Sequence, residues 1–471
     1  MASARWATPL DSIFLIGETP ETLMHVASMA ILTPPADAGR TYLSDLIAEM
    51  RSSPIEPPWT YRLQTQALMH QPLHRWVEDD GFEVEYHIRH SALPSPGGER
   101  ELGVLVSRLH SNQLDFRRPP WEMHIIEGLE GGRFAIYTKI HHSLIDGYTG
   151  MKLLQRGMST SPDDRQHPFF FSRNRSAPSA KDKREAQQVG DLASLIKGVT
   201  DSVGSLPTLA RSLVSRQFRA SSRDATRAVG SYEAPNSILN GRTGRSRRFA
   251  TQKYEISRLK AVAKAGGGTL NDALLAICAG GLRSFLTDLD ALPAKSLIAF
   301  LPVNVRPKGS QGGGNAVGAT LVALATEIED PVERFARIVA STRAAKDEMS
   351  GMTANEIIAY SGLLLAPAGF QVARAMTGLP SPIPLTLNLC ISNVPGPTEP
   401  LHLRGSRMEA IYPVSIPGHS MALNITAHSY AGFLDIGFIG CRESLPSLQR
   451  LAVHTGAALD ELERVLGVGP A

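Results

Sequence analysis

The sequence predicts an α/β protein with mixed sheets in two domains. Residues 1–172 and residues 249–471 each alternate between stretches with helix periodicity and stretches with strand periodicity. Between them, residues 173–248 are markedly basic and have helical spacing only. A chain of 471 residues is long enough for two or three cores. We therefore expect an N-terminal domain, a basic helical crossover and a C-terminal domain with these boundaries.

The elements of the first domain follow from the spacing of apolar residues. Pro9 followed by Leu10, Asp11 and Ser12 is typical of a helix start. Spacings of three and four predict helices, and alternation or short apolar runs bounded by turns predict strands. Helices are expected at Tyr42–Met50, Glu99–His110 and Gly150–Gln155, and strands at His25–Leu32, Phe82–His90, Trp121–Leu129 and Arg133–Ile140.

The second domain shows the same two periodicities. Leu385–Asn393 is apolar on both faces, which is typical of a strand in the centre of a sheet. Helices are expected at Thr269–Leu282 and Ser444–Leu466, and further strands at Ser296–Asn304, Ala319–Thr326 and Gly432–Ile439.

The crossover at 173–248 holds 15 Lys and Arg against 6 Asp and Glu, a local net charge of +9. It contains two apolar series at helical spacing, from Leu192 to Leu206 and from Leu209 to Phe218. One interpretation is a linker with a solvated face. The other is a surface for anionic lipid or for the phosphates of a nucleotide-tailed substrate.

Composition excludes several classes of function. A net charge of +3 is too small to indicate a nucleic-acid partner. Cys278, Cys390 and Cys441 are too far apart for a disulfide framework or a metal knuckle, so we expect no metal and a reducing, cytoplasmic setting. The N-terminus lacks the pattern of a secretory signal. The longest apolar stretch, Gly362–Gly369, falls short of a membrane-spanning helix.

The strongest chemical signal is His141-His142 followed by Asp146 and Gly147, at the end of a predicted strand. Adjacent residues on an extended chain point to opposite faces, so the two histidines cannot readily chelate one metal ion. One histidine is then expected to face a cavity while the other packs. A neutral imidazole suits a general base acting on a hydroxyl. Asp146 could orient an imidazole, cap the next helix or pair with an arginine, and Gly147 allows a tight exit.

This HHxxxDG pattern resembles the signature of CoA-dependent acyltransferases of the chloramphenicol acetyltransferase type, which include condensation domains. The surrounding motifs narrow the resemblance to bacterial wax ester synthase/diacylglycerol acyltransferases, in the family's order and over nearly the whole chain. They are Pro9-Leu10-Asp11, Met24-His25-Val26, Pro120-Trp121-Glu122, Asn271-Asp272, Ile391–Pro397 and Ala422–Thr426. Two positions depart from the family: Pro120 stands where it has Leu, and Ser420 where it has Gly.

The resemblance implies two chloramphenicol-acetyltransferase-like domains with a tunnel between them. It implies that His142 takes a proton from a long-chain fatty alcohol or diacylglycerol, which attacks acyl-CoA and gives a wax ester or storage triacylglycerol without a covalent intermediate. His141 would support the strand, Asp146 and Gly147 would be structural, and Asn271 would give polar support. Ser420 and Met421 would lie in the tunnel wall. Acyl-CoA is then a substrate and no cofactor is needed. A peripheral site on the inner membrane face or on lipid inclusions would follow.

Two other readings stay open at this point. Gly418-His419-Ser420-Met421-Ala422 is similar to a nucleophile elbow, which would make the protein a serine thioesterase with Asp435 and His454. That motif requires a helix after the serine, whereas the following residues have strand character. The third reading is a non-catalytic, condensation-like binding protein, against which the intact HHxxxDG argues. Asn271 could also simply be a helix N-cap.

Overall fold

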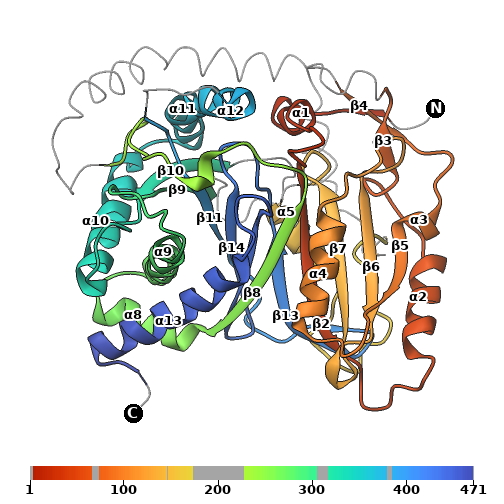
Figure 1. Ribbon diagram of the computed structural model, residues 1–471. Coiled ribbons are helices and arrows are strands. Elements are labelled where there is room, and N and C mark those ends of the chain that lie inside the picture. Colours follow the sequence, from red (N-terminus) through yellow and green to blue (C-terminus); the bar gives the residue numbers. More distant parts are fainter. Residues whose placement is uncertain are drawn as a thin grey trace.

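The computed structural model describes residues 4–65, 74–145, 147–172, 228–304, 317–378 and 384–469. Two six-stranded sheets lie next to each other in this structure (Figure 1). The sheet of the N-terminal half has the order β12-β13-β2-β7-β6-β5, in which only β5 and β6 run parallel. Its strands are β2 (His25–Thr33), β5 (Ile88–Ala92), β6 (Trp121–Glu127), β7 (Phe134–His141), β12 (His402–Leu403) and β13 (Ser406–Val414).

Both faces of this sheet are covered, and strand β7 is buried at every position. Its side chains alternate between two cores: Phe134 and Ile136 pack in one, Ala135 and Tyr137 in the other. Helix α2 (Tyr42–Ser52) covers the first face and α4 (Glu99–His110) the second. Smaller elements complete this half: β1 (Ala4–Trp6), α1 (Pro9–Ile16), β3 (Tyr61–Leu63), β4 (Arg75–Glu78), α3 (Val84–His87) and α5 (Gly147–Arg156).

The second sheet has the order β10-β9-β11-β14-β15-β8. Strand β11 lies inside it and runs parallel to both neighbours, as the apolar Leu385–Asn393 stretch predicts. The strands are β8 (Arg247–Glu255), β9 (Ile298–Asn304), β10 (Val317–Ala323), β11 (Leu389–Val394), β14 (Leu423–Tyr430) and β15 (Phe433–Cys441).

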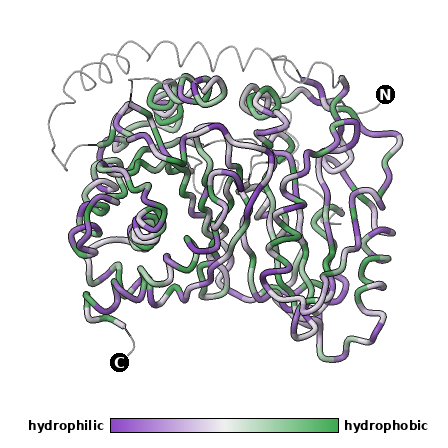
Figure 2. Tube along the Cα trace, in the orientation of Figure 1, coloured by the Kyte–Doolittle hydropathy of each residue, from purple (hydrophilic) through white to green (hydrophobic). Residues whose placement is uncertain are grey.

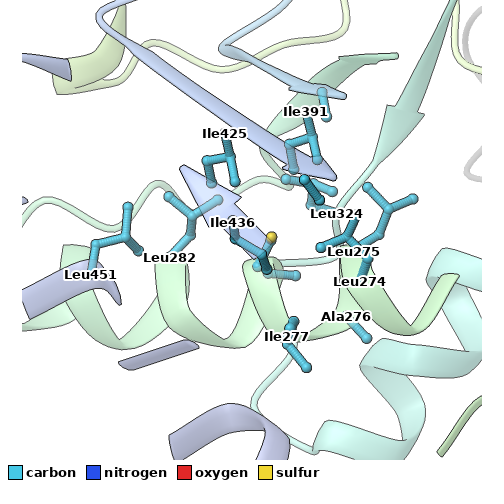
Figure 3. Close-up of a cluster of buried hydrophobic side chains, with 14 of the residues drawn as sticks. Leu274, Leu275, Ala276, Ile277, Leu282, Leu324, Ile391, Ile425, Ile436 and Leu451 are labelled. Carbon is cyan, nitrogen blue, oxygen red and sulfur yellow. The ribbon is translucent and has the colours of Figure 1, made fainter. Parts of the chain in front are cut away.

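The core of the second half forms where helix α9 packs between this sheet and neighbouring helices (Figure 3). Gly280 and Gly281 let α9 approach α13 closely, because a Cβ at these positions would lie 2.7 Å and 2.6 Å from side-chain atoms of Ala458 and Thr455. The helices are α8 (Ile256–Ala265), α9 (Leu270–Asp288), α10 (Pro331–Met349), α11 (Ala354–Leu365), α12 (Ala368–Thr377) and α13 (Leu448–Leu466).

Most predicted elements are confirmed within a few residues, but the strand predicted at Phe82–His90 is wrong in its first half. Residues Val84–His87 form a helical turn, and β5 begins only at Ile88. The reason is His87, whose ring stacks on Trp121 at 4.6 Å and whose Nδ1 donates to the Trp121 carbonyl oxygen. A regular strand would fit the alternation of apolar and polar residues in the sequence, but it would lose the buried contact between His87 and Trp121.

The two halves exchange chain, which the predicted boundaries do not anticipate. Strands β12 and β13 belong to the 249–471 segment, yet they pair in the N-terminal sheet, β13 directly with β2. The boundary at 248 also falls inside β8. Within 173–248 the structure describes only residues 228–248, so the two predicted crossover helices lie outside the described residues.

The expectation that no apolar segment is long enough to cross a membrane needs correction. Helices α11 and α12 together form a 24-residue stretch, Ala354–Thr377, with a mean hydropathy of 1.3 in its most apolar window. By length and composition alone, this one stretch among the described residues could span a bilayer. Only 22% of that window is buried inside the protein, and Ala366 and Pro367 separate the two helices.

Candidate active site

The paired histidines lie where β7 ends. Hydrogen bonds hold the backbone here on both sides: the His141 N–H donates to the Pro120 carbonyl oxygen and the His142 N–H to that of Met24, each at 2.9 Å. In the sheet, His141 stands opposite His25 of β2. The chain therefore stays extended through His141, which places the two imidazoles on different sides, as the sequence predicts.

His141 is the packed member of the pair. Its ring is fully buried and lies edge-on to Phe116 at 4.9 Å. The backbone N–H of Ser143 donates to Nδ1 at 3.3 Å, so in neutral His141 the proton sits on Nε2. That nitrogen faces the Glu18 carboxylate, with Oε2 3.6 Å away.

Glu18 is a residue that the sequence interpretation missed. Glu18 is the second residue after the end of α1, and it is 1% exposed. Oε2 accepts a hydrogen bond from the Met24 N–H, and Oε1 accepts one from the Gln113 side chain at 2.9 Å. Glu18 thus binds Met24, whose carbonyl oxygen holds His142, and faces His141. An acidic residue straight after an apolar helix was the only local signal.

His142 is the partly exposed member of the pair. Its imidazole stacks on Phe14 of α1, with ring centroids 4.0 Å apart and planes 16° from parallel. Asp146 lies outside the described residues, so its predicted orienting role stays a prediction. Gly147 is the first residue of α5, which agrees with a tight exit from the strand.

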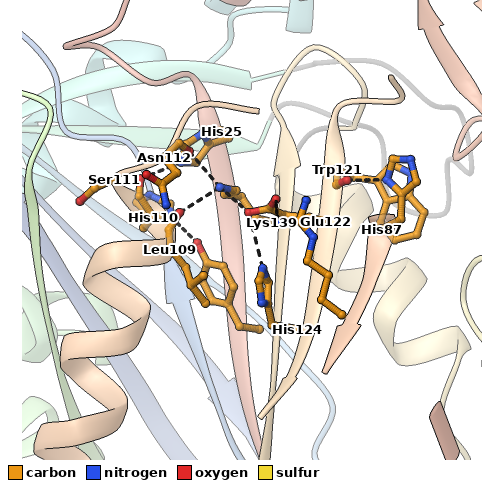
Figure 4. Close-up of polar contacts among 12 residues, drawn as sticks. His25, His87, Leu109, His110, Ser111, Asn112, Trp121, Glu122, His124 and Lys139 are labelled. Atoms are coloured by element: carbon orange, nitrogen blue, oxygen red, sulfur yellow. Dashed lines mark hydrogen bonds and ion pairs between the residues drawn. The ribbon is translucent and has the colours of Figure 1, made fainter. Parts of the chain in front are cut away.

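A buried polar network supports the strands behind the histidines (Figure 4). Lys139 of β7 is fully buried, and its ammonium donates to Glu122 at 2.6 Å and to the carbonyl oxygens of Leu109 and Asn112 at 2.9 Å. Burial opposes ionisation of Glu122, but its contact with His124 and the positive charges of Lys139 and Arg89 outweigh burial, and the pKa of Glu122 falls to about 2. Burial lowers the pKa of Lys139, and the nearby Glu122 carboxylate opposes that shift.

Two further histidines in this network are neutral. His110 Nε2 donates to the Ser415 carbonyl oxygen at 3.0 Å and its Nδ1 accepts from the Tyr137 hydroxyl at 2.8 Å. Burial, together with the nearby Lys139 charge, lowers the pKa of His110 to about 3. Burial likewise lowers the pKa of His25 well below its ordinary value. Both side chains are almost completely buried, so neither can reach the hydroxyl of a substrate.

Ser420 is buried in a turn that precedes a strand. The turn Gly418–Met421 leads into β14, not into a helix, and Ser420 itself has a left-handed φ of 62°. Its N–H donates to Gly241 and its carbonyl oxygen accepts from Asn240, while no partner of its Oγ lies among the described residues. Met421 packs against a neighbouring apolar cluster, and the place of both residues in a tunnel wall stays a prediction.

The hydrolase reading is not supported, because its three residues are not assembled. His454 on α13 bonds to Asp288 at 2.8 Å. Asp435 on β15 accepts from the Ile411 backbone N–H at 2.8 Å. Asp435 and His454 are therefore each hydrogen-bonded to a group other than Ser420. The residues after Ser420 form strand β14, whereas a nucleophile elbow requires a helix there.

Asn271 is not the N-cap of its helix. Thr269 caps α9, and Asp272 completes the capping box by accepting from the Thr269 N–H at 2.7 Å. Asp272 also accepts from Thr342 of α10 at 2.6 Å, inside the C-terminal half. No interaction among the described residues joins Asn271 to His142, so its supporting role stays a prediction. The described residues hold no cluster of metal-ligating side chains.

Comparison with known proteins gives the same assignment over the whole chain. Residues 8–274 match the wax ester synthase/diacylglycerol acyltransferase catalytic domain, and residues 313–463 match the C-terminal domain of that family. A putative diacylglycerol O-acyltransferase of Mycobacterium tuberculosis is 51% identical, covering 98% of this chain and 97% of its own. The O-acyltransferase WSD of Acinetobacter baylyi is 36% identical, covering 97% of each chain.

Solved structures agree. The wax ester synthase/diacylglycerol acyltransferase of Marinobacter aquaeolei matches with a TM-score of 0.74 and 34% identity over 98% of this chain and 99% of that one. The first condensation domain of the CDA synthetase matches with a TM-score of 0.57 and 16% identity, over 100% and 97%, which shows the shared fold only. The expected fold class and family are confirmed, and the chain belongs to the wax ester synthase/diacylglycerol acyltransferase family.

Proposed function

We propose that this O-acyltransferase moves a long-chain acyl group from acyl-CoA to a lipid hydroxyl, with His142 as the general base. The observation that carries the assignment is the contrast between the paired histidines. His141 is enclosed by Ser143, Phe116 and Glu18, whereas His142 is partly exposed. A general base must reach a substrate proton, and only the second imidazole has that access.

The reaction is a direct transfer. His142 takes the proton of the acceptor hydroxyl while that oxygen attacks the thioester carbonyl. The tetrahedral intermediate collapses, the C–S bond breaks, and the CoA thiolate takes up the proton. No bond to the protein forms, and acyl-CoA enters and leaves as a substrate and not as a resident cofactor.

The structure restricts how the acceptor approaches. Phe14 covers one face of the His142 ring, and the lone pair that takes a proton lies in the ring plane, so a hydroxyl must approach the edge of the imidazole. The bond from the His142 N–H to Met24 fixes the backbone, and Glu18 fixes Met24 in turn. The imidazole is therefore positioned before the substrate arrives, which lowers the entropic cost of reaching the transition state.

The acceptor class is proposed from the relatives. Diacylglycerol and long-chain alcohols are the acceptors that the family name describes, and both are poorly soluble in water. We expect triacylglycerol or wax ester as product, formed at the cytoplasmic face of a membrane or at a lipid inclusion. The basic 173–248 segment adds positive charge that suits CoA phosphates or an anionic lipid surface.

The test is release of free CoA from palmitoyl-CoA by the purified protein, with and without hexadecanol or a diacylglycerol. Release that requires the acceptor supports the proposal, and His142→Ala should lower it roughly 10²- to 10⁴-fold. His90→Ala, on an exposed histidine of β5, is the control and should keep full activity.

Three results would contradict the proposal. Equal CoA release without acceptor would mean that water is the acceptor and would revive a thioesterase function. Near-normal turnover by a folded His142→Ala protein would remove the general base. Absence of release with every acceptor would favour the non-catalytic binding reading.

A further inference from the structure

Helices α11 and α12 present an apolar surface to the outside of the protein. Between Glu356 and Arg374 the sequence contains no charged residue. Several large side chains of α11 and α12 point outward: Phe370 is 81% exposed, Met376, which follows Arg374, 49% and Ile358 42%. A helix that faces water normally carries charged or polar groups on that side, so this composition indicates a partner.

The opposite side of the same helices is firmly packed. Tyr360 and Leu364 of α11 are buried in an apolar cluster with Leu385. On α12, Gln371 is buried and its amide donates to the carbonyl oxygens of Leu387 and Ser420 at 2.7 Å and 3.2 Å. The helices are thus anchored on one side, and their apolar outer side is a fixed surface of the fold.

Helix α1 extends this surface toward the active site. Ile13 is 59% exposed and Ile16 42%, and Phe14, which lies between them in the sequence, stacks on His142. Figure 1 shows α1, α11 and α12 along the same edge of the molecule, and Figure 2 shows apolar residues in all three. The turn that contains Gly418 and Ser420 links α12 to the segment after α1. Gln371 of α12 donates to the Ser420 carbonyl oxygen, and Gly418 lies against Thr22, which follows α1.

We propose that Ile13, Ile16, Ile358, Phe370 and Met376 form an apolar docking face that rests on a phospholipid bilayer. The occupant is a bilayer because the face is long, uncharged and spread over three helices, and because the 24-residue α11–α12 stretch is apolar enough to enter lipid. The break at Pro367 lets the two helices lie on the surface. A water-insoluble acceptor then passes along α1 from lipid to His142.

Only this last step rests on the proposed function; the docking itself does not. The test is sedimentation of the full-length protein with phosphatidylcholine vesicles, which carry no net charge. The double variant Phe370→Asp/Met376→Asp should bind about tenfold more weakly or worse, because two exposed apolar anchors are lost. Val453→Asp is the matched control: Val453 is 65% exposed on α13 and should bind as the wild type does.

Salt separates the docking face from electrostatic binding. Binding through the docking face persists at about 0.5 M NaCl, where surface charges are screened. Three results overturn the proposal: undiminished binding of the double variant; binding that needs anionic lipid and disappears in salt, which would assign docking to the basic segment; or a wild-type dimer that the double variant dissociates while vesicle binding is unchanged.

A soluble acceptor distinguishes this proposal from the proposed function. With 1-butanol and palmitoyl-CoA the double variant should keep wild-type CoA release, while transfer to diacylglycerol in vesicles should fall with binding. If the wild type transfers to neither acceptor but the vesicle result holds, the proposed function fails and the docking face stands. If both proteins use both acceptors equally well, the route from lipid to His142 is wrong.

Discussion

Asp435 gives the most quantitative test of how the two halves are joined. It lies on β15, is fully buried, and its Oδ2 accepts the Ile411 N–H of β13 at 2.8 Å. Burial raises the pKa of Asp435 from 3.8 to about 7, against the opposing effects of that hydrogen bond and of Lys253. Because the native pKa is the higher one, the native state holds this proton more tightly than the unfolded chain does.

This difference in pKa fixes the direction in which the unfolding free energy changes with pH. The protonated carboxyl contributes its stability fully below about pH 4, and the contribution is lost as the pH rises through 7. Three pKa units correspond to about 4 kcal/mol of unfolding free energy in all. Asp435→Asn keeps an acceptor for Ile411 and cannot ionise, so the variant should be more stable than the wild type at pH 8. Between pH 8 and pH 5 this advantage should shrink by about 3 kcal/mol.

The assay is urea unfolding of both proteins at the two pH values. Asp347→Asn, on an exposed position of α10, is the control and should show no pH-dependent difference. A gain of the same size at both pH values would show that Asp435 is not protonated in the native state near neutrality. A variant less stable than the wild type at pH 8 would mean that a charged carboxylate at this place is favourable, and would refute the reasoning.

Other variants test the support of the histidines and the junction of the two halves. Glu18→Ala removes the acceptor of the Met24 N–H and the partner of His141, and should lower the unfolding free energy by about 2 to 6 kcal/mol and kcat/KM with it, whereas Glu18→Gln should retain most of both; an unchanged Tm and kcat/KM in Glu18→Ala would contradict this. Lys139→Met leaves Glu122 buried without its partner and should cost about 3 to 5 kcal/mol at pH 7. In the wild type the Glu122 contribution should fade between about pH 4.5 and 2, since its folded pKa is the lower one; urea unfolding across that range measures it. Gly437→Ala places a Cβ 1.8 Å from the Pro413 carbonyl oxygen and should cost about 2 kcal/mol or more, and a wild-type Tm would show that β13 can move away.

The sequence was sufficient for whatever depends on neighbours in the chain. Glu99–His110 has the apolar spacing of a helix and is one, and the extended His141-His142 pair divides into a packed and an accessible ring. The apolar Leu385–Asn393 stretch is a central strand for the same reason. These features follow from periodicity and backbone geometry, which are local properties.

What the sequence could not reveal depends on contacts between distant segments. The stacking of Phe14 on His142 joins residues 128 positions apart in the sequence. Nothing in the sequence around either residue predicts this contact. Glu18 has a role only because Met24, Gln113 and His141 converge on it in space. The α11–α12 stretch was underestimated because only the run Gly362–Gly369 was counted, although the helices on either side of Pro367 keep the outer face apolar.

Hydrogen bonds between the two halves link the second half to the strands behind the paired histidines. Strand β8 is the edge of the second sheet, and two hydroxyls close it: Ser107 of α4 accepts from the Phe249 N–H at 3.0 Å, and Ser111, the C-cap of α4, accepts from the Arg247 N–H at 2.9 Å. Asp435 of β15, in the second sheet, accepts the backbone N–H of Ile411 in β13, a strand of the first sheet. Edge groups that would otherwise seek water are thus satisfied across the junction. Since α4 also supplies the Leu109 carbonyl and the His110 ring of the network behind β7, a shift of one half against the other would disturb the support of His142 directly.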